Sequence, residues 1–373
     1  MEFGIFLQAH CPDRRVAEDP GYEHTSLLRE VEISVAADKA GFKYIWASEH
    51  HFLEEYSHLS ASQSFLAFVA GRTERIHLAT GIRNLSPKVN SPVTVAEEAA
   101  MMDHLTEGRF ELGTGRGAGA HEVAGFDIPD TSMTKPWWNE VIRQLPKMWA
   151  DGEYSYEDGD SFVVPGKRKV LPKPYLPGHP PLWVAAGNPQ TFQDAGKLGI
   201  GCIGFSHGSA EDMRPKIEAY KQAIAEAEPV GAYVNDNTMT TTSIVCLEDG
   251  DEARRVATDM GMVRLQAGVY RYHTTFPKPD YIPDWPQTLP EPGLDGVNKL
   301  IEGHYILCGT PDEVADQAKA FEAIGVDQLC FGLPIDTPQE VVLETIRLMG
   351  EHVIPKFDTD PVHRSTRMRE AAA

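Results

Sequence analysis

A repeating unit restricts the fold of this chain more than any other feature: a short apolar segment, a loop, and then an amphipathic segment that ends near glycine. Eight short apolar segments have the length and composition of strands: 3–7, 44–47, 76–82, 110–114, 182–186, 201–205, 240–247 and 328–333. Apolar strands that alternate with helices predict a parallel sheet covered on both faces. Eight such units in 373 residues predict an α/β fold, a closed TIM-type (β/α)8 barrel, with an open doubly wound sheet as the alternative.

Local signals at the ends of the helical segments agree with this reading. Apolar residues recur at helical spacing before Gly41, which stands where a left-handed residue ends a helix. Ser91 is placed to act as an N-cap, Pro92 suits the first helical position, and Gly108 follows the end of the same segment. We therefore expect one domain over residues 1–357.

Two insertions and a tail interrupt the pattern. Residues 152–180 are rich in Gly, Pro, Tyr and charge, and they predict a short antiparallel excursion. Residues 272–293 contain six prolines together with aromatic side chains, a composition that favours a lid over a packed element. The aromatic residues of this segment are Phe276, Tyr281 and Trp285. Residues 358–373 have little to bury, so we expect a flexible C-terminal tail.

The charge and the cysteines limit the partners and the compartment. A net charge of -21 repels phosphate backbones and anionic lipids, so we expect neither nucleic acid nor a membrane as a partner. The cysteines are far apart in the sequence and form no C-x-x-C pair, which is typical of free thiols in a reducing cytosol. We find no signal-peptide pattern and no apolar span of membrane length. The expected location is cytoplasmic.

A polar cluster, Ser48-Glu49-His50-His51-Phe52, directly follows the second predicted strand. In a barrel, residues just past the carboxyl end of a strand face the active-site mouth. The two adjacent histidines suit acid–base chemistry, metal ligation or polar positions at the barrel rim. Metal ligation is the weakest of the three, because no His-x-His motif and no clear set of carboxylate partners accompanies the pair. We therefore predict no metal site.

A glycine-rich turn ends the fourth predicted strand. Gly113, Gly115 and Gly117 alternate with Thr114 and Arg116. Small residues let backbone N–H groups approach an anion, and a guanidinium is a planar fork of donors suited to phosphate. The glycines are equally consistent with tight strand packing alone.

A second candidate anion site follows the fifth predicted strand at Gly187, Asn188, Gln190 and Thr191. Free N–H groups at the start of a helix bind anions. The alternative is an ordinary Asn N-cap followed by Pro189, which needs no ligand. Because this site and Arg116 follow successive strands, a barrel places them as neighbours that could hold one phosphate together.

These motifs, taken in order, resemble the bacterial luciferase-like monooxygenase family. The resemblance extends from Phe3 to about Phe357. Its motifs are the Glu49-to-Phe52 run, the segments 91–93, 96–99 and 103–105, the block 108–117, and the late Gly309-Thr310-Pro311-Asp312-Glu313-Val314. The family implies a TIM barrel, reduced FMN or the deazaflavin F420 as cofactor, and usually a dimer or higher assembly.

The resemblance also implies roles for particular residues. His50 matches the catalytic histidine, and Arg116 matches the arginine that binds the flavin phosphate. Gly115 stands where bacterial luciferase has a reactive cysteine, so light emission is not implied. Thr80 and Gly81 match a strand that bulges behind the flavin, sometimes with a non-prolyl cis peptide.

The second phosphate loop carries over with a departure. Gly187, Asn188, Gln190 and Thr191 occupy that loop, where many relatives have Ser or Glu. Backbone and hydroxyl donors remain, while the assignments of the side chains are weakened.

The activity that the resemblance implies is a flavin-dependent monooxygenase. A separate NAD(P)H:flavin reductase would supply reduced FMN, and O2 would oxygenate a small apolar organic substrate under the lid. The alternatives are an F420-dependent hydride-transfer oxidoreductase and a relative that binds flavin without turnover. Helices over about 62–73 and 92–105 would form a homodimer contact through the apolar side chains Phe65, Leu66, Phe68, Val69, Met101 and Met102.

Overall fold

Eight parallel strands form a closed barrel in the computed structural model, which describes residues 1–117, 119–205, 208–274 and 278–372. The strands are β1 (Glu2–Leu7), β2 (Tyr44–Ala47), β3 (His77–Thr80), β5 (Phe110–Gly115), β8 (Leu182–Ala186), β9 (Gly201–Gly204), β10 (Thr238–Cys246) and β12 (Gln328–Gly332). Pairing of β9 with β10, of β10 with β12 and of β12 with β1 closes the ring. The predicted TIM barrel is confirmed, and the open doubly wound sheet is excluded.

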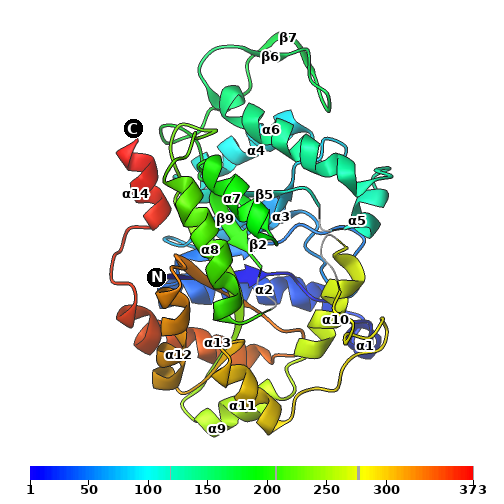
Figure 1. The fold of residues 1–373 in the computed structure, drawn as a ribbon, viewed down its shortest axis with the longest axis vertical. Helices are drawn as coiled ribbons and strands as arrows, with labels where there is room; N and C mark the ends of the chain where they lie inside the picture. Colours follow the sequence, from blue (N-terminus) through cyan, green and yellow to red (C-terminus); the bar gives the residue numbers. More distant parts are fainter. Residues whose placement is uncertain (118, 206–207, 275–277, 373) are drawn as a thin grey trace.

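Helices surround this barrel (Figure 1). They are α1 (Asp13–Glu18), α2 (Tyr22–Ala40), α3 (Ser62–Ala70), α4 (Pro92–Leu105), α5 (Ala120–Ala124), α6 (Thr134–Trp149), α7 (Pro189–Lys197), α8 (Ala210–Ile224), α9 (Gly250–Ala257), α10 (Met262–Tyr272), α11 (Leu294–Glu302), α12 (Pro311–Ala323), α13 (Gln339–Leu348) and α14 (Arg364–Ala371). Short helical turns cover η1 (Thr131–Met133), η2 (Met349–Val353) and η3 (Ile354–Lys356). Within the described ranges, no helix is both long and apolar enough to span a lipid bilayer.

The ends of two helices follow the local signals of the sequence. Gly41 ends α2 in a left-handed conformation with φ 90°, which glycine adopts without steric cost. Pro92 is the first residue of α4, and Ser91 stands at its N-cap. The Ser91 hydroxyl makes no capping hydrogen bond within the described residues, so Pro92 is the stronger start signal.

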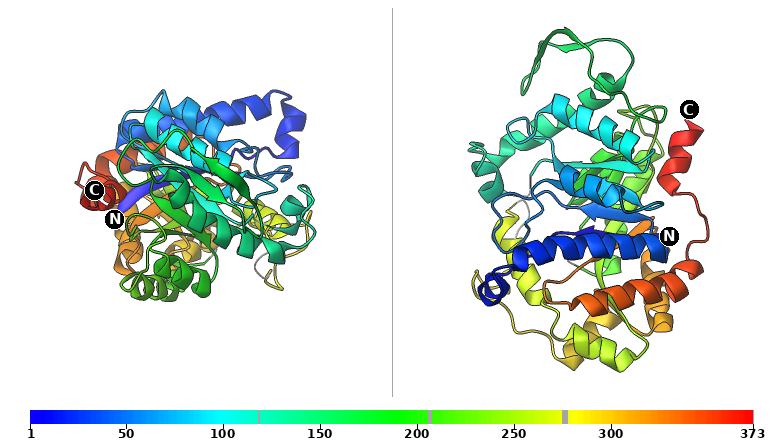
Figure 2. Two further views of the ribbon diagram at one scale, coloured as in Figure 1. Left: turned by 90° about the horizontal axis from the view of Figure 1, so that it is seen from above. Right: turned by 180° about the vertical axis from the view of Figure 1, so that it is seen from behind.

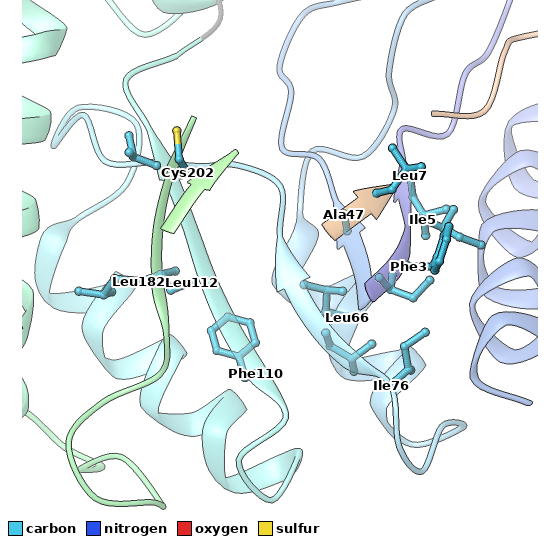
Figure 3. Packing of buried hydrophobic residues seen from close by; sticks show 14 of the residues in the cluster. Phe3, Ile5, Leu7, Ala47, Leu66, Ile76, Phe110, Leu112, Leu182 and Cys202 are labelled. Atoms are coloured by element: carbon cyan, nitrogen blue, oxygen red, sulfur yellow. The ribbon is translucent and has the colours of Figure 1, made fainter. Parts of the chain in front are cut away.

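Apolar side chains fill the barrel and the layer around it. The interior holds a cluster from β1, β2, β3, β8, β9, β10 and β12: Phe6, Tyr44, Trp46, Ala79, Trp183, Ile203, Met239 and Cys330. A larger cluster lies between the strands and the helices. Figure 3 shows part of it, with Phe3 and Ile5 on the side of β1 that faces α2. This burial on both faces explains why the strands are continuously apolar.

Elements beyond the eight units are attached at three places. The insertion at 152–180 contains β6 (Tyr154–Tyr156) and β7 (Val164–Arg168), an antiparallel pair that projects from one end of the molecule in Figure 1. Strand β4 (Arg83–Asn84) pairs with the end of β5. Strand β11 (Ile306–Gly309), which the sequence analysis did not predict, pairs with the second half of β10 outside the barrel.

The end of the chain is packed against the barrel, contrary to the flexible tail expected for 358–373. In its described part, α14 buries Ser365 and Arg369. The Arg369 guanidinium donates to both carboxylate oxygens of Asp103 at 2.8 Å. The expectation failed because this segment is held by buried polar contacts, which a search for apolar positions does not detect.

The segment predicted as a lid lies between α10 and α11. From residue 278 to 293 the described chain forms neither helix nor strand. Phe276 and Pro277 of the predicted lid lie outside the described residues. Trp285 lies against two arginines of α10, with guanidinium carbons 5.2 Å (Arg264) and 5.1 Å (Arg271) from its ring centre.

Candidate functional site

The site residues predicted from the sequence lie at the carboxyl end of the barrel strands. Figures 1 and 2 show α1, α5 and α10 at this end, while α14 and both chain ends lie at the other. Loops at the carboxyl end carry the active sites of TIM-barrel enzymes.

His50 follows β2, and its side chain is 11% exposed. Its Nδ1 lies 3.6 Å from Oε1 of Glu122, a buried carboxylate on α5. The same Oε1 accepts a hydrogen bond of 2.9 Å from the backbone N–H of His51. Glu122 therefore holds the loop after β2 in place and lies beside the His50 ring.

Tyr56 is the centre of an aromatic cluster around His50. The ring centres of His10, His50 and His273 lie 5.7, 5.5 and 5.4 Å from that of Tyr56. Burial raises the pKa of Tyr56 to about 12 and lowers the pKa of His10 to about 4. Both groups are therefore neutral near pH 7, and the cluster forms a largely apolar wall beside His50.

His51 belongs to a different network from its neighbour. Its Nε2 lies 3.4 Å from Glu49 Oε1. Glu49 is buried and accepts hydrogen bonds of 2.7 Å from both Arg83 and Asn90. This network joins the loop after β2 to β4 and α4, so of the two adjacent histidines only His50 enters the aromatic cluster.

Thr80 and Gly81 lie where β3 ends. Thr80 is fully buried and donates a hydrogen bond of 2.8 Å to the carbonyl of Gly113. A Cβ at Gly81 would lie 2.8 Å from the Phe6 ring and 3.1 Å from Trp46 Cβ, so only glycine fits without a shift. The chain leaves the sheet after Thr80 and resumes as β4. Among the described residues only X-Pro bonds are cis, so this segment is trans.

Gly115, the last residue of β5, also has no room for a side chain. A Cβ there would lie 2.7 Å from Cγ2 of Ile82. A cysteine at this position would require the backbone or Ile82 to move. This close packing agrees with the absence of a thiol at the position.

Arg116 follows β5 and is half-buried. Its Nη1 donates to the Thr131 carbonyl at 3.2 Å and to Thr134 Oγ1 at 3.5 Å. Burial lowers the pKa of the guanidinium from its usual value, yet an arginine remains charged. The loop that carries Arg116 leads into α5, so it connects this cation to Glu122 beside His50.

The start of α7 has the geometry of a capped helix. Asn188 Oδ1 accepts hydrogen bonds from the Thr191 N–H at 3.0 Å and from its hydroxyl at 3.3 Å. Gln190 turns its side chain to Asp194, 2.8 Å away. A Cβ at Gly187 would meet no atom within 4 Å, so space is open beside that residue.

Arg116 and α7 are neighbours through the start of α6. Thr134 contacts Arg116, and the adjacent Lys135 forms an ion pair with Asp194 of α7 at 3.4 Å. The structure therefore brings the two predicted anion sites to the same side of the mouth. In the part of the chain that the structure describes, no group of three or more His, Cys, Asp or Glu is placed to hold a metal ion.

Four residues of the site were missed from the sequence: His10, Tyr56, Glu122 and His273. Glu122 and His273 come from segments far apart in the chain, and neither is part of a recognisable motif. Tyr56 lies six positions after His50, a spacing that carries no signal in an irregular loop. Only the three-dimensional structure brings them together.

Comparisons with known proteins agree with this architecture. The profile of the luciferase-like monooxygenase family matches residues 1–328. The oxygenase component of a flavin-dependent trigonelline monooxygenase from Acinetobacter baylyi is 25% identical over 98% of both chains. An F420-dependent glucose-6-phosphate dehydrogenase from Amycolatopsis mediterranei is 24% identical over 88% of this chain and 93% of its own.

A solved structure shows the same fold. The oxygenating constituent of 3,6-diketocamphane monooxygenase from Pseudomonas putida, in complex with FMN, matches with a TM-score of 0.72. It is 18% identical and covers 95% of this chain and 98% of its own. Fold and relatives define an oxidoreductase on a luciferase-like barrel. The chain belongs to the luciferase-like monooxygenase family, and the resemblance read from its motifs is confirmed.

Proposed function

We propose that this protein is the oxygenase of a two-component flavin-dependent monooxygenase. A separate NAD(P)H:flavin reductase supplies reduced FMN, and O2 oxygenates a small organic substrate. The observation that carries the proposal is the pairing of His50 with Glu122 at 3.6 Å inside the barrel mouth, joined by one loop to Arg116. The short segment that carries Arg116, the proposed phosphate-binding group, also carries Glu122, which contacts the proposed proton-handling group His50.

The residues present fit a phosphorylated flavin. Arg116 offers a guanidinium on the mouth side, and the open space beside Gly187 leaves room for a ligand at the start of α7. Because Asn188 takes the Thr191 N–H and Pro189 has none, the N–H of Gln190 is the remaining donor of the first turn. Arg116 therefore provides most of the attraction for the phosphate. Bound reduced FMN supplies the electrons and the site at which O2 reacts.

The protein's own groups perform the remaining tasks. His50 holds or releases a proton at its imidazole nitrogens, and the Glu122 carboxylate, 3.6 Å away, helps to position the ring. Tyr56 and His10, both neutral, exclude water from one side of the reacting centre. Thr80 and Gly81 form a close-packed floor without side chains that would obstruct a planar ring.

The proposal extends to a lid, a location and an assembly. The described part of 272–293 lies over α10, where it could cover bound flavin and substrate. The free, buried cysteines suit a reducing compartment, so the proposed location is the cytoplasm. Phe68 and Met101, on α3 and α4, are 46% and 48% exposed, so a homodimer contact there would remove apolar surface from water.

The test is product formation by purified protein supplied with FMN, a flavin reductase, NADH and O2. Reduced FMN alone consumes O2 and releases hydrogen peroxide, so the diagnostic result is oxygen incorporated into product, with less peroxide released, when the protein and an acceptable substrate are both present. A parallel assay with reduced F420 distinguishes the alternative, because hydride transfer from F420 proceeds without O2. Substrate turnover with reduced F420 under anaerobic conditions, together with none from FMN and O2, would replace the proposal with an F420-dependent oxidoreductase.

A further inference from the structure

A cavity of about 380 Å³ lies between α10 and the segment that follows it. Its described lining comes from Ala267, Tyr270, Arg271, His273, Thr274, Lys278, Pro283, Asp284 and Trp285. This volume is at the lower end of the range of small-molecule sites, so it suits a molecule of one or two rings. None of the residues predicted from the sequence as catalytic or cofactor-binding lines it.

The charge of the lining is opposite to that of the protein. Arg271 and Lys278 face the cavity together with a single carboxylate, Asp284, whereas the whole chain carries -21. Asp284 is paired with Lys278. The Arg271 guanidinium uses Nη2 to bind Glu54 at 2.7 Å, and no other hydrogen bond to it occurs in the described chain. Its remaining N–H groups are therefore available to an anion.

Planar groups form the walls of the same cavity. Trp285 and Tyr270 line it, and Trp285 is held by the guanidinium of Arg271. A flat aromatic ligand between such rings gains offset-stacked or edge-to-face contacts. The Arg271 guanidinium, over the Trp285 ring with 5.1 Å between its carbon and the ring centre, adds a planar fork that matches a carboxylate.

His273 connects the cavity to the candidate catalytic centre. It lines the cavity, and its ring centre lies 5.6 Å from that of His50. The His273 ring thus lies between a molecule in the cavity and His50, the proposed proton-handling residue. This position distinguishes the cavity from an unrelated surface hollow.

We propose that this cavity is the substrate site, and that the substrate is a small planar aromatic acid whose anionic group binds Arg271. As a statement about substrate, the inference rests on the proposed function; as a statement about binding, it does not require flavin. It also refines the apolar substrate expected from the sequence, because the remaining N–H groups of Arg271 favour a ligand that carries a negative charge.

The test is a calorimetric titration of the full-length protein with three probes of similar size. Benzoate has the ring and the charge, benzamide has the ring alone, and cyclohexanecarboxylate has the charge alone. We expect benzoate to bind at least tenfold more tightly than either control, since a charge-assisted hydrogen bond contributes a factor of about ten to a hundred. Equal affinity for benzoate and benzamide would overturn the assignment to an acid.

Variants locate the binding. Arg271→Gln is expected to weaken benzoate about ten- to a hundredfold while leaving benzamide unchanged, and Arg271→Lys to retain part of the affinity. Trp285→Ala is expected to reduce the preference for benzoate over cyclohexanecarboxylate. The matched control is Arg254→Gln, which removes an arginine that is likewise paired with a glutamate, Glu313, but lies away from the cavity. Loss of benzoate affinity in the control as well as in Arg271→Gln would refute the location.

Flavin titration separates this inference from the proposed function. If FMN binds in a manner that depends on Arg116 but benzoate does not bind, the substrate assignment alone fails. If benzoate binds through Arg271 but the protein neither binds FMN nor consumes O2 with it, the cavity assignment stands as a binding site and the proposed function fails. Competition between FMN and benzoate that depends on Arg271 would assign the cavity to the cofactor and overturn the inference.

Discussion

Replacement of Arg369 by alanine is expected to destabilise the whole barrel, although this residue lies only four positions before the last residue of the sequence. Arg369 is 3% exposed, and its partner Asp103 is fully buried in α4. The guanidinium donates to both Asp103 oxygens at 2.8 Å, to the Leu176 carbonyl at 2.7 Å and to the Pro177 carbonyl at 3.0 Å. Truncation leaves a buried carboxylate without its cation.

The magnitude follows from that geometry. Removal of one partner of a buried, hydrogen-bonded ion pair costs about 3–5 kcal/mol, mostly because the other charge stays buried. Asp103 would keep only the N–H groups of Tyr175 and Leu176, at 2.9 and 3.3 Å. We therefore expect a loss of about 3–5 kcal/mol in the free energy of unfolding.

The assay is urea unfolding followed by circular dichroism, with Arg367→Ala as the matched control. Arg367 lies on the same helix and pairs with Asp360 at 2.6 Å, but both side chains are about half exposed, at 55% and 42%. Such a surface pair contributes about 0–1 kcal/mol. If the two variants lose the same small amount of stability, α14 is an appendage and the reasoning is refuted.

Four other predictions concern the mouth of the barrel. His50→Ala should keep FMN affinity within a few-fold and lower product formation about 10²- to 10⁴-fold, measured by flavin titration and turnover; unchanged turnover would falsify the role. Arg116→Ala should weaken FMN far more than riboflavin, which has no phosphate, whereas an equal loss for both ligands would move the arginine away from the phosphate. The pKa of His10 is about 4 in the fold against an ordinary 6.5, so the unfolded chain binds more protons between these values. The stability that neutral His10 contributes is therefore complete above pH 6.5, and the free energy of unfolding should fall by about 2 kcal/mol by pH 5. Urea unfolding at several pH values should show a smaller fall for His10→Gln. Replacement of 276–290 by a Gly/Ser linker should raise the ratio of hydrogen peroxide released to product formed, and an unchanged ratio with normal FMN binding would contradict a lid.

The barrel strands were predictable because burial on both faces leaves a strong local pattern. The segments 44–47 and 182–186 match β2 and β8 residue for residue. Strand β11 was not predicted because the eight other strands already complete the barrel. Its four residues pair with the part of β10 that extends beyond the barrel. Sequence periodicity reports local burial, and it does not report which strand a segment pairs with.

The candidate site was predictable only where a residue directly follows a strand. His50 and Arg116 do so, and their position alone places them at the mouth. Glu122 and His273 reach His50 from α5 and from the end of α10, so their roles depend on how distant segments pack. The sequence left two interpretations of Asn188 open, an anion site and an ordinary helix N-cap. Its hydrogen bonds to Thr191 favour the N-cap, while the open space beside Gly187 still leaves room for a ligand.

A structural ion pair at the closed end and the histidine at the mouth differ in how their buried polar atoms are satisfied, and this difference supports placing the chemistry at the mouth. At the closed end, Arg369 and Asp103 satisfy one another with backbone groups around them, as expected of a purely structural pair. At the mouth, Nδ1 of His50 is buried without a hydrogen-bond partner among the described residues, and the Glu122 oxygen nearest to it is 3.6 Å away. An unsatisfied buried nitrogen costs stability, so it persists where it serves a purpose other than folding. A proton or a ligand group that satisfies His50 during the reaction provides that purpose.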